Sequence, residues 1–335
     1  MTQREDGRWV DTIVVNGKRR YFYGKTKAEV KKKMMAFKDN ASRGFRFAEA
    51  ADAWYEEAQN RLAFNTVKSY HAPYLCAKDA FGDRRIGEIT PVMVSGELSR
   101  YAKLHYTTKT VKNYKLVLNL IFRYAVEKGM AAYNPAADIR SPDGQPNRKR
   151  HAPSREDIQR VKDHVSDPFG LFAYMAMYTG LRKGELLALT WNDIDMKNRT
   201  ISVTKSICHV NNAPTVKLPK TETSVGVVPI VDALMPHLRH KGAGIVFPNK
   251  EGEYMTDTQF MLAWAAYKKI AGISASPHQF RHAYATMLFE AGIPPERMQA
   301  LLRHAQLSTT MDVYKDLRDA ELKKIHESVY GVDIG

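Results

Sequence analysis

Cysteine is scarce in this sequence, with 2 among 335 residues. Cys76 and Cys208 lie far apart, outside any CxxC pair or metal-ligand spacing. A disulfide framework or a zinc site needs several cysteines, or cysteines with histidines, at short fixed intervals. We therefore expect neither a structural disulfide nor a zinc site.

Long apolar runs are missing as well. No stretch approaches the roughly 20 apolar residues that cross a bilayer as a helix. The first residues, Met1 to Asp6, lead into no apolar segment of the kind found in signal peptides. The sequence also shows no amphipathic anchor or lipidation signal. We expect a cytoplasmic protein without a membrane partner.

Basic residues are plentiful: 51 Lys and Arg stand against 36 Asp and Glu, a formal net charge of +15. Residues 1–44 alone hold 12 basic and 5 acidic side chains, and the rest of the chain is also basic. The length predicts two or three domains. A basic excess spread over all of them suits a polyanion that several domains bind together.

The N-terminal segment, residues 1–44, is predicted to form a small sheet plus one helix. Bulky and polar residues alternate around Asn16-Gly17, a strong signal for a two-residue hairpin turn. Thr26 and Glu29 then form a capping box that opens a basic helix. The hairpin offers Arg19, Arg20 and Tyr21 to a DNA groove. The alternative is a solvated basic hairpin that only improves solubility.

Residues 45–140 are predicted to be a helical bundle, because apolar residues recur there at helical spacing. The stripes are most simply core. Lys109 and Lys112, on the polar face of the last helix, are candidates for phosphate contacts. Charges on a helix are more often only solvated, so this prediction depends on the rest of the chain.

Residues 141–152 break the helical pattern with two prolines, a glycine and the basic run Arg148, Lys149 and Arg150. We interpret them as an interdomain linker, whose charge either holds DNA between two domains or is merely solvated.

Residues 153–335 mix helical patterns with strand patterns. The expected fold is therefore multidomain and mainly α with small β-sheets: a sheet plus helix, a helical bundle, and a mixed α+β domain.

Arg182 stands in the first turn of a predicted helix after Thr179-Gly180. Positive charge at that place opposes the helix dipole unless an anion is shared between the side chain and the helix N-terminus. Glu185 is placed to hold the guanidinium, although an ordinary surface ion pair would have the same spacing. Arg182 is therefore a site candidate.

A second group of candidates lies near the C-terminus. Ser276-Pro277 predicts a helix start, which puts His278 and Arg281 one turn apart on one face. His304 and Tyr314 follow after a Gly-Ile-Pro-Pro break. Two histidines, an arginine and a tyrosine are what a site needs to attack a phosphodiester and stabilise its charge without a metal.

Taken in order, Arg182, His278, Arg281, His304 and Tyr314 resemble the catalytic set of the tyrosine recombinases, or phage-type integrases. The string YTGLRKGE at 178–185 is similar to that family's Thr-Gly-Leu-Arg-x-x-Glu box. The string LRH followed by STT-x-x-x-Tyr is similar to its nucleophile box. The first two segments resemble the arm-binding and core-binding domains of integrases from temperate phages and conjugative transposons.

The resemblance implies a site-specific recombinase that integrates and excises a mobile element. Tyr314 would form a 3'-phosphotyrosyl bond, with Arg182 and Arg281 on the phosphate oxygens and His278 exchanging a proton. His304 would donate a further hydrogen bond to the phosphate, and Lys220 would protonate the departing 5'-oxygen. No metal and no cofactor is implied. The implied partners are double-stranded DNA attachment sites, three further copies of the chain in a homotetramer, and accessory DNA-bending or directionality proteins.

The sequence departs from the family pattern in two places. Arg303 stands where the family usually has a glycine before the second histidine, and an arginine often found after the lysine turn is replaced around Gly226. Lys217 and Lys205 lie close enough in sequence to compete with Lys220 for the role of general acid.

Two other classes of protein compete with the recombinase. A relaxing enzyme of the type IB topoisomerase kind shares this chemistry, but it needs no tetramer. A non-catalytic, architectural DNA-binding protein would have no reason to combine all these groups in one site.

Overall fold

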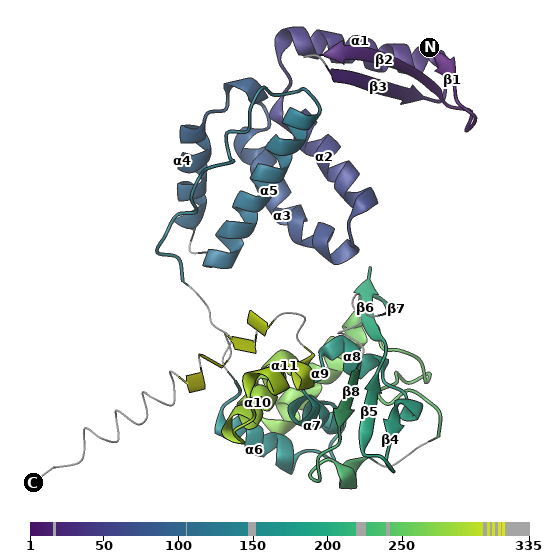
Figure 1. The fold of residues 1–335 in the computed structure, drawn as a ribbon, viewed down its shortest axis with the longest axis vertical. Helices are drawn as coiled ribbons and strands as arrows, with labels where there is room; N and C mark the ends of the chain where they lie inside the picture. Colours follow the sequence, from purple (N-terminus) through teal and green to yellow (C-terminus); the bar gives the residue numbers. More distant parts are fainter. Residues whose placement is uncertain are drawn as a thin grey trace, which may run out of the picture. The chain divides into compact units, whose positions relative to one another are not determined.

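The computed structural model describes residues 1–15, 18–104, 106–146, 152–218, 226–238 and 242–303, together with 307–308, 310–311, 314–315 and 317–318. These residues are mostly helical with small antiparallel sheets, which confirms the expected fold class (Figure 1). The chain divides into two compact units, Met1–Lys149 and Arg150–Gly335. The boundary falls inside the segment that the sequence marks as a linker.

The first unit begins with a three-stranded antiparallel sheet and one helix. The strands are β1 (Thr2–Gln3), β2 (Trp9–Val15) and β3 (Lys18–Gly24), and α1 (Lys27–Arg43) follows. Val15 pairs with Lys18, which confirms the hairpin; the turn residues 16 and 17 lie outside the described residues. The predicted capping box is half formed. Thr26 Oγ1 accepts from the Glu29 N–H, but the Glu29 carboxylate accepts from the Lys25 N–H.

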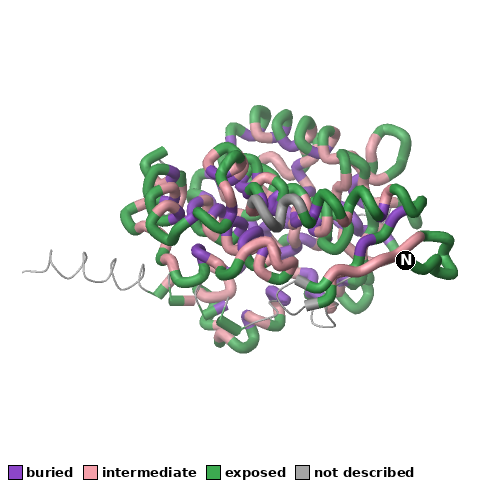
Figure 2. Tube along the Cα trace, turned by 90° about the horizontal axis from the view of Figure 1, so that it is seen from above, coloured by how far each residue is buried: buried purple, intermediate pink, exposed green. Residues whose placement is uncertain are grey.

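Four α-helices follow in the same unit: α2 (Phe47–Arg61), α3 (Phe64–Phe81), α4 (Pro91–Ala102) and α5 (Thr108–Glu127), with a short 3-10 turn η1 (Ile86–Glu88) before α4. The predicted apolar stripes are buried, on α2 as Phe47, Ala50, Ala51, Trp54 and Ala58, and on α5 as Val111, Val117, Leu118, Ile121 and Ala125. Phe22 and Val30 belong to the same core as these helices. The N-terminal sheet and the bundle therefore share one core. Figure 2 marks the buried, intermediate and exposed positions along the backbone.

The second unit combines helices with a small antiparallel sheet. Its elements in chain order are α6 (Arg155–Asp163), α7 (Gly170–Thr179), α8 (Lys183–Ala188), η2 (Trp191–Asp193), β4 (Ile194–Asp195), β5 (Thr200–Val203), β6 (Ser206–Val210), β7 (Ala213–Lys217), β8 (Gly226–Pro229), η4 (Met235–His237), α9 (Asp257–Ala271), α10 (Pro277–Glu290) and α11 (Pro295–Leu302). The sheet has the order β4-β5-β8, and β6 pairs with β7 as a separate hairpin.

Helix α7 lies at the centre of this unit. It packs against α10, α6 and α8, and most of its residues are buried because its sequence is apolar on every face. Asp157 on α6 is buried, and its carboxylate accepts hydrogen bonds from the Ser274 N–H, the Ser274 hydroxyl and the Ala275 N–H. These bonds fix the chain just before α10, which begins at Pro277 as predicted. The start of α10 is thereby held against the core.

Candidate active site

Arg182 and Glu185 form the first pair of the site. Arg182 directly precedes α8, and the carboxylate of Glu185 accepts from the Arg182 backbone N–H at 2.9 Å and from Nη1 at 2.8 Å. The Glu185 side chain is 8% exposed, whereas that of Arg182 is 42% exposed. The pair is thus not the ordinary surface ion pair that its spacing allowed. A buried carboxylate holds a guanidinium that remains open to solvent on one side.

Arg281 is the second guanidinium, and it is almost fully buried on α10, at 4% exposed. Nη1 donates to the carbonyl of Gly180 and Nη2 to the carbonyl of Leu302. Burial, followed by the positive charge of Arg182, lowers the pKa of Arg281 to about 9. An anion beside Arg281 would offset both causes, because it would stabilise the charged form.

Gly180 is required where it stands, between α7 and α8. Its φ of 62° lies in the left-handed region, and a Cβ built on it would lie 2.4 Å from Cδ1 of Tyr284. Only glycine meets both conditions at low cost. Its carbonyl is therefore fixed as the acceptor for Arg281.

Arg303 is a third guanidinium that the sequence did not lead us to count among the site residues. It follows α11 with φ 51° and ψ 49°, and its side chain is 3% exposed. Nη2 donates to Glu185 at 2.6 Å, and the Arg303 carbonyl accepts from Arg182 Nη2 at 3.4 Å. The sequence signal for it was a charged residue at a turn position that the family fills with glycine.

Among the described residues, Glu185 is the one carboxylate bonded to these guanidiniums: it accepts from Arg182 and Arg303, while Arg281 donates to the carbonyl of Leu302. Burial raises its pKa, but the charge of Arg303, the N–H of Arg182 and the charge of Arg182 outweigh burial and leave the pKa below its ordinary value. The carboxylate remains ionised at neutral pH and balances one of three positive charges. Among the described residues, this network has the excess positive charge that an anion site needs.

His278 lies in the first turn of α10 on an exposed position, with its ring 4.9 Å from that of His282. Tyr314 is half-buried, and its ring meets that of Phe289 edge to face at 4.9 Å. Tyr314 packs on a small cluster of buried residues that comprises Tyr284, Ala285, Met298 and Leu302. Leu302 is also the residue whose carbonyl accepts from Arg281, so the tyrosine and the arginines share neighbours.

His304 and Lys220 lie outside the described residues, so their predicted roles stay predictions. The competing lysines are described. Lys205 Nζ pairs with Asp193 at 2.8 Å and is 25% exposed, and Lys217 is the last residue of β7. The ammonium of Lys205 is thus already held by a carboxylate.

The predicted DNA contacts of the N-terminal sheet separate by strand face. Arg19 and Tyr21 are exposed, and the Tyr21 ring stacks near that of Tyr23. Arg20 points to the other face, because successive strand residues alternate. Its Nη1 donates to the carbonyl of Lys128 at 2.7 Å, and its guanidinium lies 4.2 Å from the centre of the Phe37 ring.

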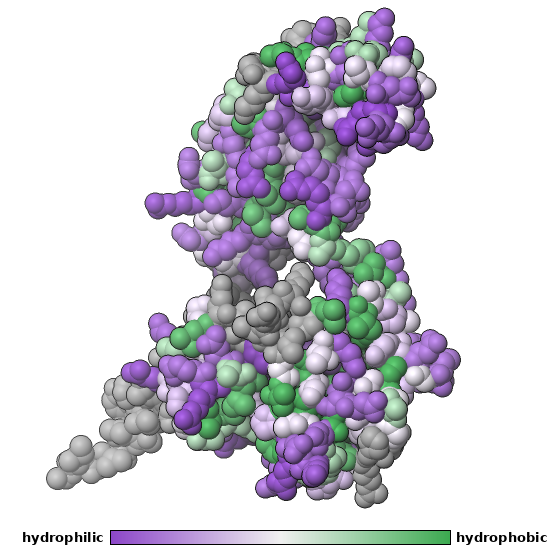
Figure 3. Space-filling view, turned by 45° about the vertical axis from the view of Figure 1, so that its right-hand side comes forward, coloured by the Kyte–Doolittle hydropathy of each residue, from purple (hydrophilic) through white to green (hydrophobic). Residues whose placement is uncertain are grey.

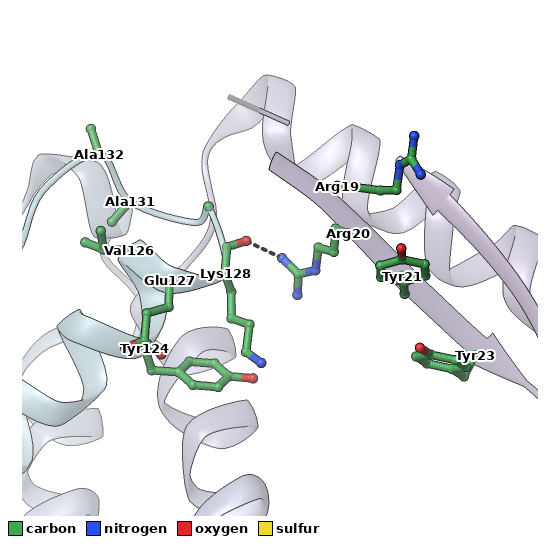
Figure 4. A pocket seen from close by; sticks show the side chains of 11 residues that line it. Arg19, Arg20, Tyr21, Tyr23, Tyr124, Val126, Glu127, Lys128, Ala131 and Ala132 are labelled. Carbon is green, nitrogen blue, oxygen red and sulfur yellow. Dashed lines mark hydrogen bonds between the residues drawn. The ribbon is translucent and has the colours of Figure 1, made fainter. Parts of the chain in front are cut away.

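Hydrophilic side chains cover much of the visible face of the first unit (Figure 3). A pocket of about 550 Å³ lies between β3 and the end of α5 (Figure 4).

The remaining predicted DNA contacts lie on α5 and in the linker. Lys109 and Lys112 are exposed on α5, and Arg148, Lys149 and Arg150 lie outside the described residues.

The described residues offer neither a metal-ligand cluster nor a membrane-spanning helix. No group of three or more His, Cys, Asp and Glu side chains is placed to hold a metal ion in that part of the chain. In the same part, no helix has both the length and the apolar character to span a bilayer.

Comparison with known proteins places this architecture in a family. Residues 159–321 match the model of the phage integrase family, and residues 47–142 match that of the phage integrase central domain. A tyrosine recombinase XerD of Vibrio vulnificus is 30% identical over 62% of this chain and 69% of its own length. The chain belongs to the phage integrase family of tyrosine recombinases. The expectation of a site-specific DNA recombinase from this family is confirmed.

Other relatives span more of the chain. A XerC-like tyrosine recombinase of Caldanaerobacter subterraneus is 28% identical over 89% of this chain and 88% of its own length. The solved integrase of transposon Tn1549, bound to a circular intermediate DNA, has a TM-score of 0.67 at 19% identity, covering 82% of this chain and 99% of that one. A lambda integrase tetramer bound to a Holliday junction has a TM-score of 0.61 at 17% identity, covering 92% and 93%. Both solved structures share the fold.

Proposed function

We propose that the guanidiniums of Arg182 and Arg281 bind the non-bridging oxygens of a DNA phosphodiester and that Tyr314 attacks its phosphorus. Two arginines, Arg182 and Arg303, pair with one buried carboxylate, and Arg281 bonds the Leu302 carbonyl next to Arg303. The observation that carries this proposal is the local excess of positive charge that this arrangement leaves. A planar fork of N–H donors suits phosphate oxygens, and fixed positive charge favours the more highly charged transition state.

The reaction is an exchange of phosphoryl esters. The Tyr314 hydroxyl forms a bond to phosphorus, and the bond from phosphorus to the 5'-oxygen breaks, leaving a 3'-phosphotyrosyl bond and a 5'-hydroxyl. The phenol proton passes to His278, because imidazole exchanges protons near neutrality. The 5'-oxygen takes a proton from Lys220, and His304 donates to a phosphate oxygen. Attack by the 5'-hydroxyl of another strand reverses the step, so no external energy source is needed.

Several surfaces of the chain contribute to DNA binding. The exposed side chains of Arg19, Tyr21, Lys109 and Lys112 are suited to phosphate and groove contacts, as is the basic run at residues 148–150. Arg20 instead joins the N-terminal sheet to the bundle through Lys128. We propose that Arg20 contributes to DNA binding indirectly, by orienting the N-terminal sheet.

The assembly that fits this chemistry is a homotetramer on double-stranded DNA attachment sites, since strands must pass between two duplexes. The solved lambda integrase tetramer on a Holliday junction supports this assembly. We propose that the chain integrates and excises a mobile element in the cytoplasm of a bacterial or phage-infected cell, assisted by DNA-bending or directionality proteins.

The test uses full-length protein and a nicked suicide DNA that carries the attachment site. The wild type becomes covalently attached to the 3' side of the break without Mg²⁺, and Tyr314→Phe does not. An adduct that persists in Tyr314→Phe would remove Tyr314 from its role. A strict requirement for Mg²⁺ would overturn the metal-free chemistry.

The general acid has a test of its own. Lys220→Ala loses cleavage of ordinary DNA and regains it on a substrate with a 5'-bridging sulfur, because thiolate leaves without a proton. Lys217→Ala and Lys205→Ala are the matched controls and keep their response to both substrates unchanged. Rescue of Lys217→Ala in place of Lys220→Ala would reassign the acid.

A further inference from the structure

Arg303 is buried but incompletely paired. One of its three nitrogens, Nη2, pairs with Glu185 at 2.6 Å. Among the described residues, Nε and Nη1 have no hydrogen-bond partner, although both are shielded from solvent. Burial lowers the pKa of Arg303, because it disfavours the charged form of the guanidinium. A buried guanidinium with two unpaired donors costs folding free energy, so a role at the site is the economical explanation.

The backbone on either side of this side chain is tied to the other two arginines. The carbonyl of Leu302 accepts from Arg281, and the carbonyl of Arg303 itself accepts from Arg182. The Arg303 side chain donates to the Glu185 carboxylate, which also accepts two hydrogen bonds from Arg182. A shift of Arg303 would therefore be transmitted to both phosphate-binding guanidiniums.

The stem of Arg303 runs across Gly226, the first residue of β8. A Cβ built on Gly226 would lie 2.9 Å from Cδ and 3.5 Å from Cγ of Arg303. The φ of Gly226 is not positive, so an alanine there would be resisted by Arg303 and not by its own backbone. The absence of a side chain at position 226 thus makes room for Arg303.

We propose that Arg303 is a positioning residue of the phosphodiester site: it holds Glu185 so that Arg182 presents its fork to the phosphate, and it adds the third positive charge that draws the anion. The proposal rests on the proposed function of Arg182 and Arg281. It explains why an arginine occupies position 303, where the left-handed backbone would favour a glycine.

The first test compares Arg303→Gly with the wild type in adduct formation on the suicide DNA. Glycine suits the left-handed backbone, so the variant removes the side chain without straining the turn. We expect adduct formation to slow by about 10- to 100-fold, the loss that follows from misplaced reacting groups. Arg303→Lys, which keeps the charge and loses the fork, should recover part of the rate. Adduct formation at the wild-type rate in Arg303→Gly would overturn the proposal.

A second substrate separates positioning from general stability. A methylphosphonate at the scissile position replaces one charged oxygen with a methyl group. We expect Arg303→Gly to slow adduct formation on the methylphosphonate much less than on the phosphodiester. The methylphosphonate carries one negative charge fewer, so the loss of the Arg303 positive charge affects its reaction less. Equal slowing on both substrates would mean a purely structural role and would overturn the proposal. If the wild type forms no adduct at all, the proposed function fails first, whatever Arg303 does.

Gly226 supplies a variant that leaves Arg303 in place. Gly226→Ala should slow adduct formation in the wild type and add no further loss in the Arg303→Gly background, since the clash is then gone. Gly244→Ala is the matched control, because a Cβ at Gly244 meets nothing within 4 Å. Additive losses of Gly226→Ala and Arg303→Gly would show that the two positions act independently, against the proposal.

Discussion

Glu185 is the residue whose replacement tests the charge balance of the site most sharply. Its carboxylate accepts three hydrogen bonds, two from Arg182 and one from Arg303, at 2.6 to 2.9 Å. Glu185→Gln keeps the shape and removes the charge, and one amide N–H then faces a donor. Breaking a buried ion pair in this way costs about 3–5 kcal/mol. For a unit of this size, that loss lowers the melting temperature by about 6–20 °C.

The loss depends on pH in a defined direction. The folded-state pKa of Glu185 lies below the ordinary value of 4.5, so its contribution is fully present above that value. The contribution disappears as pH falls through the folded-state pKa, where the carboxylate takes up a proton. The difference in stability between wild type and Glu185→Gln is therefore widest at neutral pH and narrows as the pH falls below the ordinary value of 4.5 toward the folded-state pKa.

Differential scanning calorimetry of full-length protein measures this gap, because the two units can give separate transitions. Glu290→Gln is the matched control: Glu290 is exposed at the end of α10, so its loss should change the melting temperature little at any pH. An equal melting temperature for wild type and Glu185→Gln at neutral pH would mean that the charge of Glu185 does not stabilise the fold. So would a gap that widens as the solution is acidified.

Two other substitutions test how the site and the N-terminal sheet are held. Gly180→Ala should destabilise the second unit by about 1–3 kcal/mol and abolish adduct formation, because the new Cβ meets Tyr284 and left-handed backbone is strained for alanine. Thermal unfolding measures the first effect and the suicide DNA assay the second. A stable, active variant would contradict the requirement for glycine at position 180. Arg20→Ala should speed amide exchange in β2 and β3, since the bond to Lys128 is lost. Arg19→Ala should leave exchange unchanged and weaken DNA binding with a reduced salt dependence, and the opposite pattern would exchange the roles given to the two arginines.

Local sequence signals predicted much of the fold. The apolar stripes of α2 and α5 are buried as expected, since each is defined within one helix. Ser276-Pro277 marked the start of α10, because an N-cap and a first-turn proline act over a few residues. The pairing of Arg182 with Glu185 could also be anticipated, since three residues separate them.

The rest depended on contacts between distant segments. Arg303 meets Glu185 across 118 positions, and no local pattern indicates that a turn arginine will be buried there. The space it fills exists because Gly226 lacks a side chain. Arg20 was grouped with Arg19 and Tyr21, although strand alternation places it on the opposite face, where it meets Lys128 and Phe37.

We propose that one tyrosine out of 17, Tyr314, becomes covalently bonded to the DNA. The most direct measurement is to trap wild-type protein on the nicked suicide DNA, digest the adduct, and identify the modified peptide by mass spectrometry. We expect a single DNA-linked peptide, with a 3'-phosphate ester on Tyr314. A phosphate ester on any other residue, or DNA attached through its 5' end, would contradict it.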